Sequence, residues 1–152
     1  MKHSSRRSPV ATLAVSLLLA LLALLATPTR AEMRQYGSFE VHYSVFASSF
    51  LQPDIAAAYG IVRAKDRALL NIAVRRGTRD AATVSAVLSG TRGDLIRKTP
   101  LEFREIREDQ AVYYIAEFGF VSGETQYFDI AIQPAGEARP LVLQFNHVLY
   151  AD

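Results

Sequence analysis

The chain has 152 residues, no cysteine and a formal net charge of +2. This length suits one domain, and the lack of cysteine excludes disulfides, thiol nucleophiles and Cys-ligated zinc. Four of the 17 basic residues and none of the 15 acidic residues lie in residues 1–31, so residues 32–152 carry 13 basic and 15 acidic groups. That net charge of −2 gives no reason to expect a nucleic-acid partner.

Residues 1–31 have the three parts of a secretory signal peptide. A basic start that ends at Arg7 is followed by the Leu-rich apolar segment 10–26 and then by small residues up to Ala31. We predict export and cleavage between Ala31 and Glu32. An uncleaved anchor is the alternative, because an apolar run of about 17 residues is at the lower limit for a membrane span. After cleavage, no stable membrane span is expected.

The remaining residues, 32–152, predict one domain that is rich in strands. Apolar and polar residues alternate along 39–46, a period that is typical of a half-buried strand. Further strands are predicted at 61–63, 68–74 and 82–88, and the segment 90–94 is predicted to be a loop.

One short helix is predicted at Pro53–Tyr59. Pro53 fits the first helical position, Asp54 suits the positive end of the helix, and Gly60 can take the left-handed cap. A helix of two turns is marginal by itself. We therefore expect it to be a crossover between strands that Ile55 and Tyr59 hold in place.

The densest run of strand-forming residues lies at 101–132 and predicts a three-stranded antiparallel meander. In the predicted register, Phe103 pairs with Tyr114 and Phe118 pairs with Phe128. One face is then apolar and faces the core. With a last strand at 141–150, about seven strands and one short helix favour an immunoglobulin-like β-sandwich, with a small barrel as the second choice.

The outer face of this meander is the first candidate binding surface. It is predicted to expose six side chains together: Arg104, Tyr113, Ile115, Glu117, Tyr127 and Asp129. Tyr and Arg are enriched at interface hot spots. The alternative is a solvated sheet face that cross-strand pairs stabilise.

A second candidate binding surface lies at residues 58–65, where Tyr59, Arg63 and Lys65 follow the predicted helix. An aromatic side chain and two cations meet there at the helix end. The alternative is a packed helix exit with solvated charges.

Sequence patterns of known catalytic sites are missing. The chain has no G-x-S-x-G elbow, H-E-x-x-H helix, phosphate loop or dinucleotide fingerprint. A two-His-one-carboxylate metal site formed by Glu40, His42 and His147 is the enzymatic alternative. The alternation of side chains along the strands argues against this site. Glu40 and His42 alternate with core residues and are expected to point away from the core, whereas His147 falls on the same face of its strand as core residues. We therefore assign no catalytic residue, metal ligand or cofactor.

Four stretches together carry a family resemblance: V-H-Y at 41–43, A-Y-G-I at 58–61 with Arg63 and Lys65, L-E-F-R-E-I at 101–106, and Y-Y-I-A-E-F at 113–118. With these stretches the chain resembles a small exported proteobacterial family catalogued as a domain of unknown function, number 4426. The family often has Asn after V-H-Y, where this chain has Ser44. The resemblance implies a leader peptide, a periplasmic location in a Gram-negative bacterium and a β-sandwich. It implies no activity, cofactor or catalytic residue.

The sequence therefore favours a periplasmic, non-enzymatic β-sandwich that binds an envelope protein or a peptide. The binding candidates are Arg104, Tyr113, Glu117, Tyr127, Tyr59 and Arg63. A small metal-dependent or hydrolytic enzyme is the alternative, and a purely structural envelope domain is the second alternative.

Overall fold

The computed structural model describes residues 31–77 and 82–151. Residues 1–30 lie outside the described residues, so the signal peptide and its cleavage after Ala31 stay predictions. The described residues form nine strands, a single 3-10 turn and one α-helix, in this order: β1 (Glu32–Tyr36), β2 (Phe39–Ala47), η1 (Ser48–Phe50), α2 (Pro53–Ala58), β3 (Arg67–Arg76), β4 (Ala86–Gly93), β5 (Lys98–Pro100), β6 (Arg104–Glu108), β7 (Ala111–Gly119), β8 (Thr125–Pro134) and β9 (Leu141–Val148). Neither of these helices is long and apolar enough to cross a membrane.

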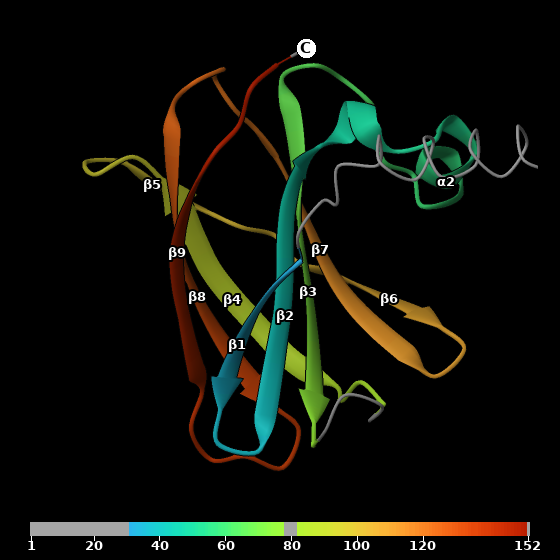
Figure 1. Cartoon of the computed structure of the whole chain (residues 1–152), viewed down its shortest axis with the longest axis vertical. Coiled ribbons are helices and arrows are strands. Elements are labelled where there is room, and N and C mark those ends of the chain that lie inside the picture. The colour runs from blue at the N-terminus through green and yellow to red at the C-terminus, as the bar shows by residue number, and fades with distance from the viewer. Residues whose placement is uncertain (1–30, 78–81, 152) are drawn as a thin grey trace, which may run out of the picture.

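The strands form two antiparallel sheets that face each other (Figure 1). Sheet A has the order β1-β2-β3-β7-β6, and sheet B has the order β5-β4-β8-β9. The predicted β-sandwich with one short helix is therefore confirmed.

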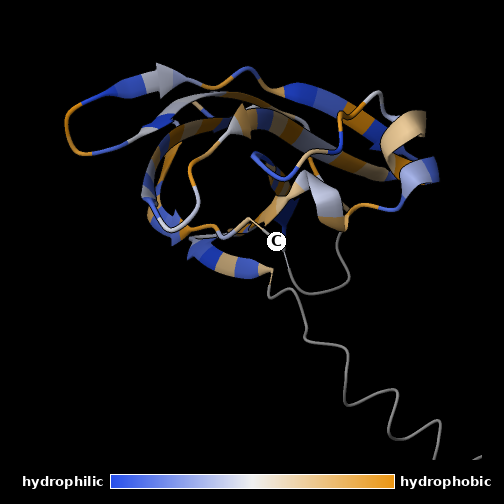
Figure 2. Cartoon of the chain, turned by 90° about the horizontal axis from the view of Figure 1, so that it is seen from above, coloured by the Kyte–Doolittle hydropathy of each residue, from blue (hydrophilic) through white to orange (hydrophobic). Residues whose placement is uncertain are grey.

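The core lies between the two sheets because apolar residues alternate along the strands (Figure 2). In β2 every second side chain is buried, from Phe39 to Ala47, and the side chains between them are half-buried. Sheet B contributes Ile130, Ile132 and Leu143, which are fully buried. Alternation is sufficient to define the core face because successive side chains of a strand point to opposite sides.

The predicted three-stranded meander is wrong in its third strand. β8 pairs with β4 and β9 in sheet B and not with β7. Phe118 and Phe128 do meet, with ring centroids 5.5 Å apart, but they do so across the sandwich and not along one sheet. The connection at residues 120–124 therefore crosses between the sheets. Alternation shows only which face of a strand is buried. The same face of β8 is buried whether β8 lies beside β7 in one sheet or faces it from the other sheet.

The hairpin of β6 and β7 is present, in a register that differs from the predicted one by two residues. Ile106 pairs with Tyr113, and Glu108 pairs with Ala111. The two-residue turn lies at Asp109 and Gln110, and Asp109 takes a positive φ of 49°, which Asp tolerates better than most residues. A shift of two residues keeps every side chain on its predicted face.

Two further segments differ from the predictions. Residues 61–63 form no strand, and β4 extends through the segment 90–94, predicted to be a loop, as far as Gly93. Gly90 belongs in this strand because a Cβ at that position would lie 2.5 Å from the carbonyl oxygen of Asp129 on β8. A glycine in a strand can mark such a close approach of two backbones.

Two tyrosine hydroxyls make polar contacts at the rim of the core. Tyr114 of sheet A accepts a hydrogen bond from the backbone N–H of Ala86 in sheet B at 2.7 Å, and its own hydroxyl donates to Glu105. The Tyr43 hydroxyl donates to Glu32 at 2.7 Å. Burial is the main cause that raises the pKa of both hydroxyls, and the neighbouring carboxylates add to it.

Alkaline pH should therefore destabilise the fold through these two groups. A raised pKa in the folded state means that their contribution is fully present below the ordinary tyrosine pKa of about 10 and is lost as pH rises through the raised value. Urea unfolding between pH 8 and pH 11 measures this loss. The double variant Tyr43→Phe/Tyr114→Phe should show a shallower fall of the unfolding free energy than the unmodified chain. Tyr150→Phe, which removes an exposed hydroxyl, is the matched control, and equal slopes in all three proteins would contradict the assignment.

Candidate binding site

Helix α2 and its exit cover part of the outer face of sheet A. Pro53 occupies the first turn, and the backbone N–H of Ile61 donates to the carbonyl of Ala56 at 2.8 Å, past Gly60 with a φ of +63°. Ala56 and Ile61 are buried against Leu69 of β3. Ile55 was expected to hold the helix but is 44% exposed. Ala56 takes that role because it lies on the helix side that faces the sheet, together with partly buried Tyr59.

Beside the helix, an apolar pocket of about 190 Å³ opens on this outer face. We call it the α2 pocket. Its walls come from the helix segment on one side and from the strands of sheet A on the other: Leu51, Ile55, Tyr59 and Ile61, and then Phe46, Leu69, Asn71, Ile106, Glu108, Tyr113 and Ile115. Apolar and aromatic walls with a few polar groups are typical of binding sites for small ligands and side chains.

Asn71 is the polar group in the wall that the β3 strand contributes. It lies between Leu69 and Ala73 on the outer face of β3, and its Oδ1 is buried without a hydrogen-bond partner among the described residues. A buried acceptor without a partner costs about 1–3 kcal/mol. Asn71 therefore places one polar side chain among the mostly apolar walls of the pocket.

A charged cluster lies near the helix exit, on the same face. Glu117 forms ion pairs with Arg104 at 3.5 Å and with Arg67 at 3.4 Å. The Arg104 guanidinium also approaches the helix end, since a Cβ built on Gly60 would lie 3.9 Å from its Nη1. Exposed pairs of this kind stabilise a fold by less than about 1 kcal/mol, so these charges are available to a partner at little cost.

The structure brings five of the six predicted binding residues to this region. Tyr59 and Tyr113 line the α2 pocket, and Arg104 and Glu117 form the charged cluster. Arg63 follows the helix and donates to the carbonyl of Ser49 at 2.8 Å, so it fixes the helix exit to η1.

Tyr127 and Asp129 lie elsewhere. Both belong to β8 of sheet B, where Tyr127 pairs with Asn146 and Asp129 pairs with Gln144. The predicted grouping of these two residues with Arg104 and Tyr113 is wrong because it depended on the pairing of β8 with β7. Asp129 instead forms a 3.8 Å ion pair with Lys98 of β5.

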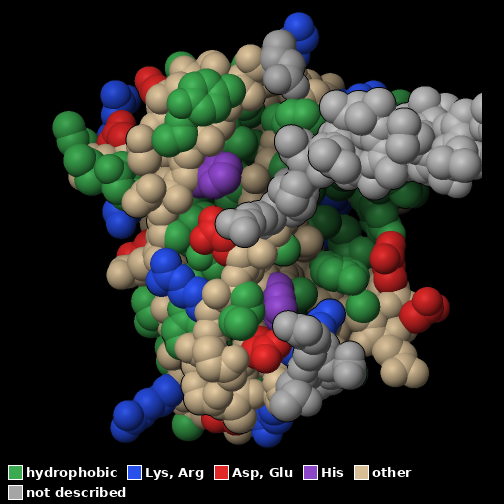
Figure 3. Space-filling model, viewed as in Figure 1, with side chains coloured by type: hydrophobic (Ala, Val, Ile, Leu, Met, Phe, Trp, Pro, Cys, Tyr) green, Lys and Arg blue, Asp and Glu red, His purple; other side chains and the backbone are tan. Residues whose placement is uncertain are grey.

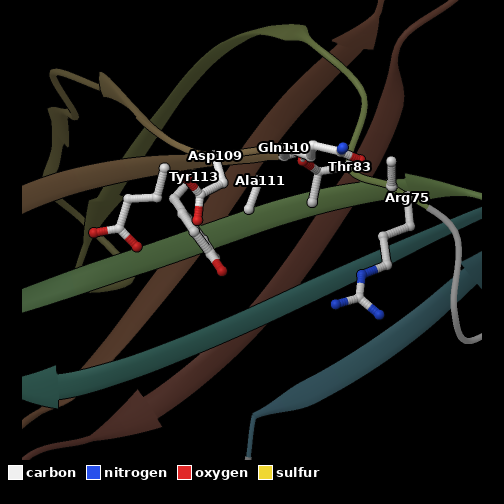
Figure 4. Close-up of a pocket in the computed structure, with 8 residues that line it drawn as sticks. Arg75, Thr83, Asp109, Gln110, Ala111 and Tyr113 are labelled. Atoms are coloured by element: carbon white, nitrogen blue, oxygen red, sulfur yellow. Dashed lines mark hydrogen bonds between the residues drawn. The ribbon is translucent and has the colours of Figure 1, made fainter.

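A second hollow, of about 410 Å³, adjoins the α2 pocket, and Glu108 and Tyr113 line both (Figure 4). Here Thr83 joins the β6–β7 turn to the strand segment before β4. Its Oγ1 accepts from the backbone N–H of Val112 at 2.6 Å and donates to the carbonyl of Gln110. Ala82, in the wall of this hollow, directly follows residues 78–81, which lie outside the described part of the chain, so no function is assigned to the hollow.

The three residues of the alternative metal site do not form one group. Glu40 and His42 lie on the outer phase of β2 and are 3.2 Å apart, whereas His147 is on β9 of the other sheet, paired with Gln126. Within residues 31–77 and 82–151, no group of three or more His, Cys, Asp or Glu side chains could hold a metal ion.

Sequence reasoning missed Asn71, Leu69 and Ile106 as parts of the site. The sequence did contain an indication of this site. In the segment A-L-L-N-I-A-V at 68–74, the side chains on both faces of the strand are apolar except for Asn71. A strand that is apolar in both phases is buried on both faces. That pattern predicts a cover on the outer face of β3, and Asn71 then stands out as a polar residue under it.

These features define the class of protein: a two-sheet antiparallel β-sandwich with an apolar pocket on the outer face of one sheet. The chain belongs to the DUF4426 family, described as a domain of unknown function, whose family model matches residues 33–152. It is similar to the crystal structure of a DUF4426 family protein from Pseudomonas aeruginosa PAO1, with 35% identity and a TM-score of 0.70 over 80% of this chain and 96% of that one.

More distant structures share the fold. A copper-bound variant of FetP from uropathogenic Escherichia coli strain F11 has 11% identity and a TM-score of 0.56, over 80% of this chain and 96% of that one. FetP as isolated, after expression in the periplasm of Escherichia coli, has 10% identity and a TM-score of 0.57, over 80% and 95%. No curated protein matches the chain.

Substitution of Asn71 tests the chemistry of the pocket. Asn71→Leu replaces an unpaired buried amide by an apolar group of similar size, so the free energy of unfolding should rise by about 1 kcal/mol. Asn146→Leu, at an exposed position of β9, is the control and should change it by less than about 0.5 kcal/mol. Chemical denaturation measures both values. A loss of stability in Asn71→Leu would mean that the amide is satisfied within the fold.

Proposed function

We propose that this protein is a non-enzymatic binding module of the bacterial cell envelope that takes an apolar side chain of a partner protein or peptide into the α2 pocket. The observation that carries the proposal is the pocket itself: mostly apolar walls that include Tyr59 and Tyr113, on the face of sheet A that also carries the charged cluster of Arg104 and Glu117. A purely structural domain has no need of such a pocket, and filling it with larger apolar side chains would stabilise the fold.

The volume of the pocket indicates the size of the occupant. About 190 Å³ suits one large aliphatic or aromatic side chain and is small for a drug-sized ligand. Tyr59 and Tyr113 in the walls add amphipathic rings, which are common in binding hot spots.

The neighbouring charges suit the polar backbone and side chains of a peptide. Arg104 presents a planar guanidinium that can bind a carboxylate or a carbonyl group. Glu117, between Arg104 and Arg67, and Glu108, at the pocket wall, offer acceptors. An apolar anchor with polar contacts around it is the usual anatomy of a protein–peptide interface.

The envelope location rests on the predicted leader at residues 1–31 and on the exported family that the sequence resembles. Together they support the periplasm of a Gram-negative bacterium. The absence of cysteine suits a domain whose stability comes from the packing of two sheets, with no disulfide.

Copper, which is named for the FetP variant, is not part of this proposal. Among the described residues, Glu40 and His42 lie 3.2 Å apart, and no third His, Cys, Asp or Glu side chain joins them in a group that could hold a metal ion. Most transition-metal sites have three or four protein ligands.

Selection of peptides from a random library on the purified protein tests the proposal. Selected peptides should share one large apolar residue, and Tyr113→Ala or Arg104→Ala should each weaken their binding by about tenfold. Tyr127→Ala, which removes a tyrosine from the outer face of sheet B, is the matched control and should leave the affinity unchanged. The proposal fails if no peptide is enriched, or if both sheet A variants bind as tightly as the unmodified protein with an intact fold.

A further inference from the structure

The connection between β4 and β5 exposes two adjacent aliphatic side chains. Leu95 is 80% and Ile96 is 91% exposed, the highest values among the large hydrophobic residues that the structure describes as exposed. The connection projects beyond the rest of the sandwich at the left of Figure 1, and its tip is hydrophobic in Figure 2. Single exposed apolar residues are ordinary on a protein surface, but two at the tip of a projecting turn call for an explanation.

This turn is held in one conformation. The Asp94 carboxylate accepts the backbone N–H groups of Ile96 and Arg97, at 2.7 Å and 2.6 Å. The backbone N–H of Asp94 donates to the carbonyl of Arg97 at 3.1 Å. At the base of the turn, Gly93 allows the backbone at the end of β4 to approach the backbone at Arg97, because a Cβ on Gly93 would lie 1.9 Å from the Arg97 carbonyl oxygen. Leu95 and Ile96 are therefore presented by a rigid turn and are not the exposed part of a collapsed loop.

Positive charge flanks the two aliphatic side chains. Arg97 and Lys98 follow them directly and are exposed, and Lys98 also forms the 3.8 Å ion pair with Asp129. The carboxylate of Asp94 is directed into the turn by its two backbone hydrogen bonds, which also hold its pKa below the ordinary value. Figure 3 shows hydrophobic side chains at the left edge of the molecule, with Lys or Arg side chains above and below them and an Asp or Glu side chain beside them.

Further exposed apolar groups lie at the same end of the sandwich. The register places Gly93 of β4 beside Tyr127 of β8, and Thr125 of β8 beside Val148 of β9. The β4–β5 turn, the β7–β8 connection and the exit of β9 therefore share one end. The β7–β8 connection carries Val121 and the exit of β9 carries Tyr150, and both side chains are also exposed. Tyrosine is enriched where proteins meet the interface of a bilayer.

We propose that the β4–β5 turn is a lipid-contact site that inserts Leu95 and Ile96 into the surface of a bilayer with anionic headgroups, which Arg97 and Lys98 contact. Aliphatic side chains bury shallowly at the boundary of headgroups and acyl chains, and each nearby cation adds attraction to anionic lipid. A convex tip with two aliphatic residues favours this occupant over a protein, because a stable protein interface buries about 800 Å² on each partner. The contact is peripheral and reversible, and it is separate from the α2 pocket on sheet A.

A local fluorescence reporter tests the proposal in the full chain, which has no tryptophan. Leu95→Trp places a single indole at the tip. Val87→Trp places one at an exposed site on the outer face of sheet B, at the opposite end of β4. With vesicles of phosphatidylethanolamine and phosphatidylglycerol, the emission of Leu95→Trp should shift to shorter wavelength and be quenched by brominated acyl chains. Val87→Trp should show neither effect. Both variants contain residues 1–30, so any membrane contact of that segment affects the two alike.

Each other outcome overturns all or part of the proposal. No shift in Leu95→Trp means that the tip does not enter lipid, which overturns the proposal. Equal shifts in both variants mean that no specific site exists. An equal shift of Leu95→Trp on phosphatidylcholine vesicles would remove the role of Arg97 and Lys98. In the Leu95→Trp background, Ile96→Ser should also lower the fraction of the tip that is inserted, by roughly fivefold, whereas Val142→Ser on β9 should not.

Discussion

The burial of β3 on both faces is the constraint on which the rest of this structure depends. Leu70, Ile72 and Val74 point into the sandwich, and Leu69 and Ala73 are buried on the other side. One sheet can cover only one of these faces. The chain therefore needs a second cover, and it supplies η1, α2 and the helix exit between β2 and β3. The crossover helix is short, but it is required because it keeps the outer side of β3 out of water.

The α2 pocket follows from the size of this cover. The helix has six residues and is about 9 Å long. It is therefore too short to cover the whole outer face of sheet A. The part of the outer face that it leaves open contains Ile106, Ile115 and Asn71. A larger residue at these positions would close the pocket and strengthen the core. The chain instead keeps a buried amide acceptor there, and stability that is given up at one place often marks function.

The two ends of the sandwich differ in their surface chemistry. The end that holds the β4–β5 turn exposes Leu95, Ile96, Val121 and Tyr150. The described turns of the opposite end are polar, such as Asp109 and Gln110 between β6 and β7, but the strands near that end expose Val87 and Val142. The proposed lipid contact and the proposed peptide binding would use different surfaces, the β4–β5 turn and the α2 pocket.

The sequence by itself determined which face of β2, β4, β6, β7, β8 and β9 is buried and where the helix lies, because side-chain alternation and helix capping are local properties. It correctly placed Arg104, Tyr113 and Glu117 on the outer face of one hairpin, and a register error of two residues did not change those faces. Only the tertiary structure decided which strands are neighbours. Phe118 and Phe128 were correctly expected to meet, but an adjacent strand in one sheet and a facing strand in the other satisfy the same hydrophobic pattern. That choice separated Tyr127 from the binding surface and brought Asn71 to Tyr59 and Tyr113, since strand pairing depends on contacts between segments that are distant in the chain.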